Sequence, residues 1–207
     1  MTNNKNAIIC FLKYPETGKV KTRLAKDIGD INATNFYKQI AQETVQKAKQ
    51  TNADIFIFYS PPQNINLKKF KTWLGKDFEY KPQQEGDLGC KMTNAFIEVF
   101  AKNYSKIVII GSDIPQITPE ILGRAFSLLE KGDTVIGPSP DGGYYLLGFN
   151  KNSFFPQVFE NIEWSTDTVY KETISKLEKF AKTYLTLESL EDVDDLQSYN
   201  RYINRGK

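Results

Sequence analysis

Three aspartates lie next to apolar segments of this chain, at positions where a carboxylate could bind a ligand or take part in a reaction. Asp113 comes just after the unbroken apolar run at residues 107–110, and Asp141 lies in a loop of prolines and glycines at residues 138–143. Asp87 stands between two glycines, before an apolar helical pattern. Open α/β sheets bind ligands at the carboxyl ends of buried strands, so Asp113 and Asp141 are candidate ligand-binding groups. Asp113 could instead be a turn or capping residue, and the loop with Asp141 could be only a long hairpin turn. Asp87 could bind a ligand at the same edge or simply cap the helix that follows it.

A basic stretch follows the first apolar run and could bind an anion. After the turn-rich residues 13–18, the chain carries Lys19, Lys21, Arg23 and Lys26. A glycine-containing loop that opens a helix directs backbone N–H groups at a ligand, while lysine and arginine supply positive charge. The stretch matches neither the Walker loop nor the dinucleotide-binding glycine pattern. A phosphate site and a solvated basic turn are therefore both consistent with it.

The chain contains no histidine and only two cysteines, which narrows the possible chemistry. Without histidine, serine–histidine and cysteine–histidine nucleophile pairs and histidine metal sites are excluded. The groups that remain are carboxylates, lysine, arginine, tyrosine and backbone amides. Carboxylate and phosphate oxygens are natural ligands of Mg²⁺ or Mn²⁺, so an oxygen-ligated divalent metal is the expected cofactor.

The composition is typical of an ordinary globular protein. The 207 residues, 40% of them hydrophobic, suffice for one well-packed domain, and we expect a single domain over residues 1–207. Lys+Arg (27) and Asp+Glu (25) are interspersed, so no basic face for nucleic acid is expected. The longest apolar runs are strand-sized and the N-terminus has no signal-peptide pattern, which predicts no membrane span and a cytoplasmic location.

The elements that must position these groups alternate along the chain. Apolar runs predict strands at residues 7–12, 54–59, 78–80, 107–110, 133–137, 144–149 and 183–187. Helical spacing of apolar residues predicts helices at residues 34–50, 67–74 and 119–131, after Asp87, after Asp167 and from Asp192 onward. This alternation predicts an α/β protein with a mostly parallel sheet covered by helices. The aspartates at residues 192–195 fit the N-terminus of the last helix, and we do not expect ligands among them.

Four motifs in this order resemble a known family. They are F-L-K-x-P-x-x-G-x-V-K-T-R-L at 11–24, Q-E-G-D-L-G-x-K-M at 84–92, G-S-D-I-P at 111–115 and P-D-G-G-Y-Y-L-L-G at 140–148. W-S-T at 164–166 and D-V-D-D-L near the C-terminus also match. The chain is similar to bacterial glycosyltransferase-like proteins of the GT-A superfamily, the selenodomain-associated or arsenosugar-biosynthesis-type transferases. The resemblance implies a three-layer α/β/α nucleotide-diphospho-sugar transferase fold, with a mostly parallel central sheet of about seven strands.

The resemblance also implies how the site is divided. The groups near the nucleotide phosphates would come from the first loop, namely Lys13, Gly18, Lys21, Thr22 and Arg23, with Asp87 as a further candidate. Asp113 would bind the metal in the position of the family's DxD motif. Because this stretch offers one carboxylate where that motif has two, a second ligand would come from Asp141 or Asp167. The sugar or acceptor would lie beside Asp141, among Gly142, Gly143, Trp164 and Thr166.

Together these features predict a metal-assisted transfer from a nucleotide-diphospho-sugar donor. The metal, Lys21 and Arg23 would neutralise charge on the leaving diphosphate. An inverting reaction also needs a carboxylate base, for which Asp141 is the first candidate and Asp167 the second. The first loop lacks the glycine pair typical of nucleotidyltransferases, which favours sugar transfer. Three alternatives stay open: a nucleotidyltransferase that forms an NDP-activated small molecule from an NTP, a catalytically idle nucleotide-binding domain, and a site for a non-nucleotide anion.

Overall fold

The computed structural model describes residues 5–62 and 64–204, and its strands form one seven-stranded sheet. The strands are β1 (Asn6–Lys13), β2 (Asp54–Ser60), β3 (Glu79–Pro82), β4 (Lys106–Ile110), β5 (Thr134–Pro138), β6 (Tyr144–Asn150) and β7 (Tyr184–Thr186). Their order across the sheet is β3-β2-β1-β4-β6-β5-β7. Neighbouring strands are parallel except where β6 pairs with β4 and β5, to which it is antiparallel. The expected mostly parallel sheet is confirmed.

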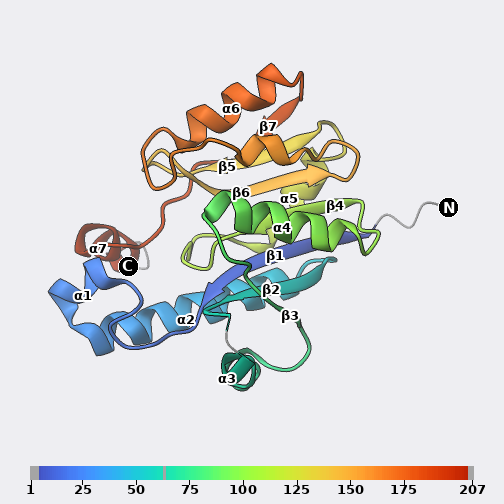
Figure 1. The fold of residues 1–207 in the computed structure, drawn as a ribbon. Coiled ribbons are helices and arrows are strands. Elements are labelled where there is room, and N and C mark those ends of the chain that lie inside the picture. Colours follow the sequence, from blue (N-terminus) through green and yellow to red (C-terminus); the bar gives the residue numbers. More distant parts are fainter. Residues whose placement is uncertain (1–4, 63, 205–207) are drawn as a thin grey trace.

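Helices cover both faces of this sheet (Figure 1). They are α1 (Thr22–Ile28), α2 (Asp30–Lys49), α3 (Asn64–Leu74), α4 (Leu88–Phe100), α5 (Pro119–Leu128), α6 (Val169–Lys179) and α7 (Leu196–Asn204), with the short 3₁₀ helix η1 (Pro156–Phe159). Within the part of the chain that the structure describes, none of these helices is long and apolar enough to cross a membrane.

Alternate residues of β1 face opposite helical layers, because successive side chains of a strand point to opposite sides of the sheet. Ile8, Cys10 and Leu12 belong to a buried cluster that includes residues of α2, α3 and α5. Ala7 and Ile9 belong to a second buried cluster with residues of α4, α6 and η1. Strands buried on both faces account for the unbroken apolar runs of the sequence. The three-layer α/β/α architecture is therefore confirmed.

Two of the expected site loops leave the sheet at the same edge because their strands are parallel neighbours. Cys10 of β1 pairs with Ile110 of β4, so the first loop and the loop with Asp113 both begin at the carboxyl ends of these strands. The loop with Asp141 joins β5 to its antiparallel neighbour β6, so it is also a hairpin turn. The hairpin turn reaches the same edge because β6 begins there, with Leu146 opposite Ile110.

The segment between β7 and α7, residues 187–195, lies across this edge without regular secondary structure (Figure 1). The backbone amides of Leu187 and Leu190 donate to carbonyls of β5, and that of Val193 donates to the Asp113 carbonyl at 3.4 Å. All three of these apolar side chains are buried. The segment is therefore fixed to the core, and it carries its aspartates into the neighbourhood of Asp113.

The last helix starts later than the sequence predicts. The prediction of a helix from Asp192 onward is wrong at its start, because α7 begins at Leu196. The Asp195 carboxylate accepts a hydrogen bond from the Ser198 amide at 2.8 Å, as an N-cap does. Of the aspartates in this run, only Asp195 lies at the N-terminus of the helix, where the sequence predicts all of them, while Asp192 and Asp194 lie before it.

Candidate active site

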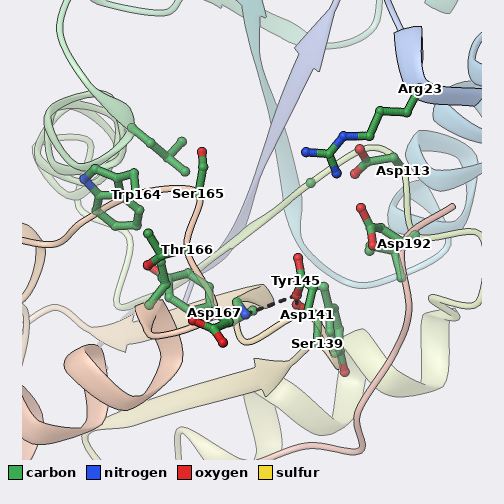
Figure 2. A pocket seen from close by; sticks show the side chains of 16 residues that line it. Arg23, Asp113, Ser139, Asp141, Tyr145, Trp164, Ser165, Thr166, Asp167 and Asp192 are labelled. Carbon is green, nitrogen blue, oxygen red and sulfur yellow. Dashed lines mark hydrogen bonds between the residues drawn. The ribbon is translucent and has the colours of Figure 1, made fainter. Parts of the chain in front are cut away.

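A cleft of about 490 Å³ opens at the carboxyl edge of the sheet. Its walls come from α1, the loop after β4, the β5–β6 turn, the segment before α6 and the segment before α7 (Figure 2). We call the part formed by Arg23, Asp113 and Asp192 the β4 end. We call the part formed by Asp141, Gly143, Thr166 and Asp167 the hairpin end. The cleft therefore draws on residues that are far apart in the sequence.

A buried lysine holds the β4 end together. Lys21 is 8% exposed, and its Nζ donates to Asp113 Oδ2 at 3.0 Å and to Asp194 Oδ1 at 3.3 Å. Burial lowers the pKa of Lys21, but the Asp113 and Asp194 carboxylates outweigh that effect and hold its pKa above the usual value. Its backbone is left-handed, with φ 48°, a conformation that costs an L-residue about 1–2 kcal/mol. The two ion pairs therefore stabilise a strained turn at the start of α1.

The exposed Arg23 forms an ion pair with Asp194, which also pairs with the buried Lys21. Its side chain is 77% exposed, and its Nη1 donates to Asp194 Oδ2 at 3.2 Å. Figure 2 shows the guanidinium of Arg23 reaching over the β4 end, near Asp113 and Asp192. Asp194 thus joins the segment before α7 to the first loop, and Arg23 remains open to a ligand.

Asp192 lines the β4 end beside Asp113 in a crowded negative environment. Burial raises the pKa of Asp192 to about 6, the Asp113 carboxylate adds to this rise, and the Lys21 ammonium opposes it. Asp141 and Asp194 also raise the pKa of Asp192. Carboxylates that lie close enough to raise the pKa of Asp192 form a site where a cation would be stabilised.

A buried tyrosine beneath the cleft connects the loops after β1 and β4. The Tyr37 hydroxyl accepts a hydrogen bond from the Lys13 amide at 3.0 Å and lies 3.1 Å from the Ser112 hydroxyl. Burial raises the pKa of Tyr37, so its hydroxyl stays protonated and keeps a hydrogen to donate. Tyr37 therefore positions Asp113, the residue after Ser112, relative to the first loop.

At the hairpin end, the Asp141 carboxylate is held within its own turn. Asp141 Oδ1 accepts hydrogen bonds from the Gly143 amide at 3.1 Å and from the Ser139 hydroxyl. Both Asp141 and Gly143 line the cleft (Figure 2). The prolines and glycines at residues 138–143 thus form a hairpin turn that also presents a carboxylate to the cleft.

The turn also packs against the segment that begins α6. Gly142 has φ 87°, and a Cβ at this position would lie 2.1 Å from the Asp167 carbonyl oxygen. Its own carbonyl accepts a hydrogen bond from the Tyr170 amide at 2.8 Å. Because only a glycine allows this close approach, Gly142 brings Asp141 and Asp167 to the same end of the cleft.

The W-S-T motif lies in the wall opposite the first loop. The Trp164 ring packs over Gly89, where an added Cβ would lie 2.8 Å from the ring, and near Phe159 at 6.4 Å between centroids. Thr166 Oγ1 donates to the Glu163 carbonyl at 2.7 Å. Both Trp164 and Thr166 line the cleft, so packing and hydrogen bonding fix this wall.

The structure brings together most, but not all, of the residues expected at the site. Those that line the cleft are Arg23, Asp113, Asp141, Gly143, Trp164, Thr166 and Asp167. Lys21 and Gly142 support it through the contacts described above. Those that do not line it are Lys13, Gly18, Thr22 and Asp87. Asp87 caps α4, accepting from the Cys90 amide at 2.7 Å, and borders a separate cavity of about 440 Å³.

Two residues of this site, Asp192 and Asp194, are not expected from the sequence. Their positions depend on the buried Leu187, Leu190 and Val193, which recur every third residue before the last helix. This spacing indicates a segment attached to the core, but it does not indicate which loop the segment crosses. The contact with Asp113 could be found only from the fold.

Within the described residues, no group of three histidine, cysteine, aspartate or glutamate side chains is close enough together to hold a metal ion by itself. A metal at this edge would therefore take at most two protein carboxylates and complete its coordination from elsewhere. Mg²⁺ is commonly bound in this way, by one or two carboxylates, water and substrate phosphates.

Comparison with known proteins identifies the family of this chain. Residues 44–166 match the model of a family described as "Uncharacterized protein conserved in bacteria (DUF2064)". The chain belongs to this family. The matched region of the DUF2064 protein includes β2 to β6 and the Asp113 and Asp141 loops, but it ends before α6.

Solved and curated relatives extend the comparison. The DUF2064 protein is 39% identical to a Desulfovibrio desulfuricans protein provisionally called a nucleotide-diphospho-sugar transferase, with a TM-score of 0.95 over 98% of this chain and 87% of that one. It is 24% identical to the 2-phospho-L-lactate guanylyltransferase of Methanosphaera stadtmanae, over 74% of this chain and 66% of that protein. The Mycobacterium tuberculosis protein Rv0371c, solved with manganese, shares the fold at 12% identity, with a TM-score of 0.58 over 98% of this chain and 99% of that one. The resemblance to the nucleotide-diphospho-sugar transferase superfamily is confirmed.

Proposed function

We propose that this protein is a glycosyltransferase-like enzyme that transfers a sugar from a nucleotide-diphospho-sugar to a small acceptor. The observation that carries the proposal is the cleft itself. At its β4 end, Arg23 faces the carboxylates of Asp113 and Asp192, which suits a metal-bound diphosphate. Its hairpin end offers Asp141, Thr166 and Asp167, which suits hydroxyl groups. The relative at 39% identity, called a nucleotide-diphospho-sugar transferase, supports the same reaction.

The donor set of the β4 end fits a divalent cation such as Mg²⁺ or Mn²⁺. Asp113 and Asp192 supply oxygen ligands. Burial raises the pKa of Asp192, and the nearby Asp113 carboxylate adds to the rise, so a cation between the two would be stabilised. In our proposal these two aspartates hold the cation, where the sequence left open a second ligand from Asp141 or Asp167 or a weakly bound metal. When bound, the cation would neutralise charge on the donor's diphosphate. The manganese complex of Rv0371c, a protein with the same fold, supports this assignment.

The basic residues of the first loop then have separate roles. Arg23 is exposed over the β4 end, so we assign it to the diphosphate, where its fork of N–H groups binds two oxygens. Lys21 is buried and already paired, so we assign it to positioning Asp113 and Asp194. Lys13, Gly18 and Thr22 lie outside the cleft lining, and we assign this loop to the nucleoside side of the donor. Asp87 caps α4 beside a separate cavity, so we assign it no role in donor binding.

In the proposed step, an acceptor hydroxyl oxygen bonds to the anomeric carbon while the bond from that carbon to the diphosphate oxygen breaks. The nucleoside diphosphate leaves with the electron pair, and a carboxylate takes the proton of the hydroxyl. Asp141 is our first candidate for this base, because two hydrogen bonds orient it in the cleft wall. Asp167 is the second. Gly142, Gly143, Trp164 and Thr166 would shape the sugar and acceptor site around them.

Nucleotidyl transfer is the second candidate, and one specific observation favours it. The curated relative at 24% identity is named as a guanylyltransferase. In that reaction the small substrate attacks the α-phosphorus of an NTP and pyrophosphate leaves. The same β4 end could bind either a triphosphate or a diphosphate, so the products decide between the two reactions.

The test is a product analysis by anion-exchange chromatography and ³¹P NMR. The protein is incubated with each NDP-sugar or NTP, with Mg²⁺, Mn²⁺ or a chelator, and with a mixture of small alcohols and sugars. Metal-dependent release of NDP from one donor series, lost in Asp113→Asn, is the expected result. Release of pyrophosphate from an NTP would establish nucleotidyl transfer instead. A thermal shift with nucleotide but no product would indicate an idle binding domain, and a shift with inorganic phosphate alone would indicate an anion site.

A further inference from the structure

The two ends of the cleft differ in whether their carboxylates have cationic partners. At the β4 end, Lys21 and Arg23 face Asp113 and Asp194 within 3.3 Å. At the hairpin end, Asp141 and Asp167 form no ion pair with any described residue of the chain. Among the described residues that line the cleft, Arg23 is the one lysine or arginine, and it belongs to the β4 end. The hairpin end therefore carries uncompensated negative charge.

The remaining polar groups at the hairpin end do not offset this charge. The Asp141 carboxylate already takes the Gly143 amide and the Ser139 hydroxyl, so these donors are not free for an anion. The Thr166 hydroxyl donates its hydrogen to the Glu163 carbonyl. What this end presents to a ligand is mainly oxygen acceptors, which bind hydroxyl and ammonium hydrogens and repel phosphate or carboxylate groups.

We propose that the hairpin end takes a neutral polyhydroxyl or amine-bearing acceptor and excludes phosphorylated and carboxylated ones. This inference rests on the proposed function, in which the diphosphate of the donor occupies the β4 end. It separates the protein from its curated relative, whose name specifies a phosphorylated acid as the small substrate. Cationic side chains are the strongest partners of such a substrate, and the described lining of the hairpin end has none.

The charge preference can be measured without knowing the acceptor. The nucleotide-free protein is studied by NMR in the presence of a chelator. Amide proton relaxation is recorded with added nitroxide probes that carry an ammonium, a carboxamide or a carboxylate group. At the amides of Gly143 and Thr166, the ammonium probe should enhance relaxation about threefold or more over the carboxylate probe, since clefts lined by one sign of charge concentrate the opposite ion. In the Asp141→Asn/Asp167→Asn double variant, this ratio should fall at least halfway towards one.

Asp77→Asn is the matched control, because Asp77 is an exposed surface carboxylate outside the cleft lining. It should leave the ratio unchanged. Equal or stronger relaxation by the carboxylate probe in the unsubstituted protein would overturn the proposal, as would a ratio that the double variant does not change.

The same preference should appear in turnover with three forms of one polyol: neutral, amine-bearing and phosphorylated. We expect the rate of transfer to the phosphorylated form to be at least about tenfold lower than the faster of the rates to the neutral and amine-bearing forms. Fastest transfer to the phosphorylated form would overturn the proposal. Donor binding is followed separately by thermal shift, so loss of the proposed transferase function and loss of this charge preference give different results.

Discussion

The β4 end and the hairpin end of the cleft differ in whether cationic side chains accompany their carboxylates. At the β4 end, the buried Lys21 and the exposed Arg23 share Asp194, and Lys21 also pairs with Asp113. Asp113 and Asp192 line the cleft there. At the hairpin end, Asp141 is held by an amide and a hydroxyl, without any cation among the described residues. In our proposals, the β4 end binds a metal-bound diphosphate and the hairpin end binds uncharged or cationic groups.

The two ends are also positioned by different forces. Charge fixes the β4 end, because Lys21 ties the first loop to Asp113 and Asp194. Close backbone packing fixes the hairpin end, because Gly142 lies against the Asp167 backbone, where no side chain fits. Substitutions that remove charge should therefore affect the first end, and substitutions that add volume should affect the second.

The largest effect is expected from Asp113→Asn. It keeps the size of the side chain but removes the charge proposed to hold the cation, so turnover should fall at least about 10²-fold. The fold should persist, because Lys21 keeps its contact with Asp194. NDP release at saturating donor and metal measures the change, with Asp77→Asn on the surface as the control. Activity within twofold of the unsubstituted protein would remove Asp113 from the cation site.

Gly142→Ala tests the packing of the hairpin end. The new methyl group would meet the Asp167 backbone at 2.1–2.4 Å at a position with φ 87°, so the turn must move. We expect the free energy of unfolding to fall by about 2–4 kcal/mol, from overpacking and backbone strain together. Urea denaturation measures this.

Gly123→Ala is the matched control for that substitution. Gly123 lies within α5, and a Cβ there has no heavy atom within 4 Å. Alanine in this helix should raise the free energy of unfolding by up to about 1 kcal/mol. If both substitutions gave the same stability, the docked turn described here would be incorrect.

The fold and much of the cleft lining could be predicted from the sequence. Buried strands of a parallel sheet produce unbroken apolar runs, and residues at their carboxyl ends must meet at one edge, so Asp113 and Asp141 could be located from pattern alone. Periodicity within a segment also placed the helices. These predictions depend on local pattern and on a general rule of α/β topology.

Other features of the site depend on contacts between distant segments and could not be predicted in this way. Asp192 and Asp194 look like helix-capping residues in the sequence, yet the extended segment before α7 carries them to Lys21, across more than 170 residues. Asp87 shows the opposite case. Its glycine-flanked position suggests a ligand, but the carboxylate caps α4 and borders another cavity.

Lys21→Met should have a smaller effect on stability than Gly142→Ala. Removing a buried ammonium leaves Asp113 and Asp194 without their common partner, but both carboxylates are more than one third exposed, so water screens part of the cost. We expect a loss of about 2 kcal/mol in the free energy of unfolding. Arg23→Gln, which removes an exposed cation from the same aspartate, should change stability by less than about 0.5 kcal/mol. Urea denaturation at pH 7 measures both variants. Equal losses in the free energy of unfolding would contradict the positioning role of Lys21.

The smallest effect expected is a change in the pH dependence of stability in Asp192→Asn, measured with chelator present. The pKa of Asp192 is raised to about 6 in the folded protein, chiefly by burial and then by Asp113. A carboxyl whose pKa is higher in the folded than in the unfolded state favours folding when protonated, so its contribution is complete below about pH 4 and is lost as pH rises to about 6. Between pH 4 and pH 7, the unsubstituted protein should therefore lose about 1 kcal/mol more stability than Asp192→Asn. Parallel stability profiles for the two proteins would show that neither burial nor the Asp113 carboxylate raises the pKa of Asp192 in the folded protein. The contrast between the two ends would then rest on their cations alone.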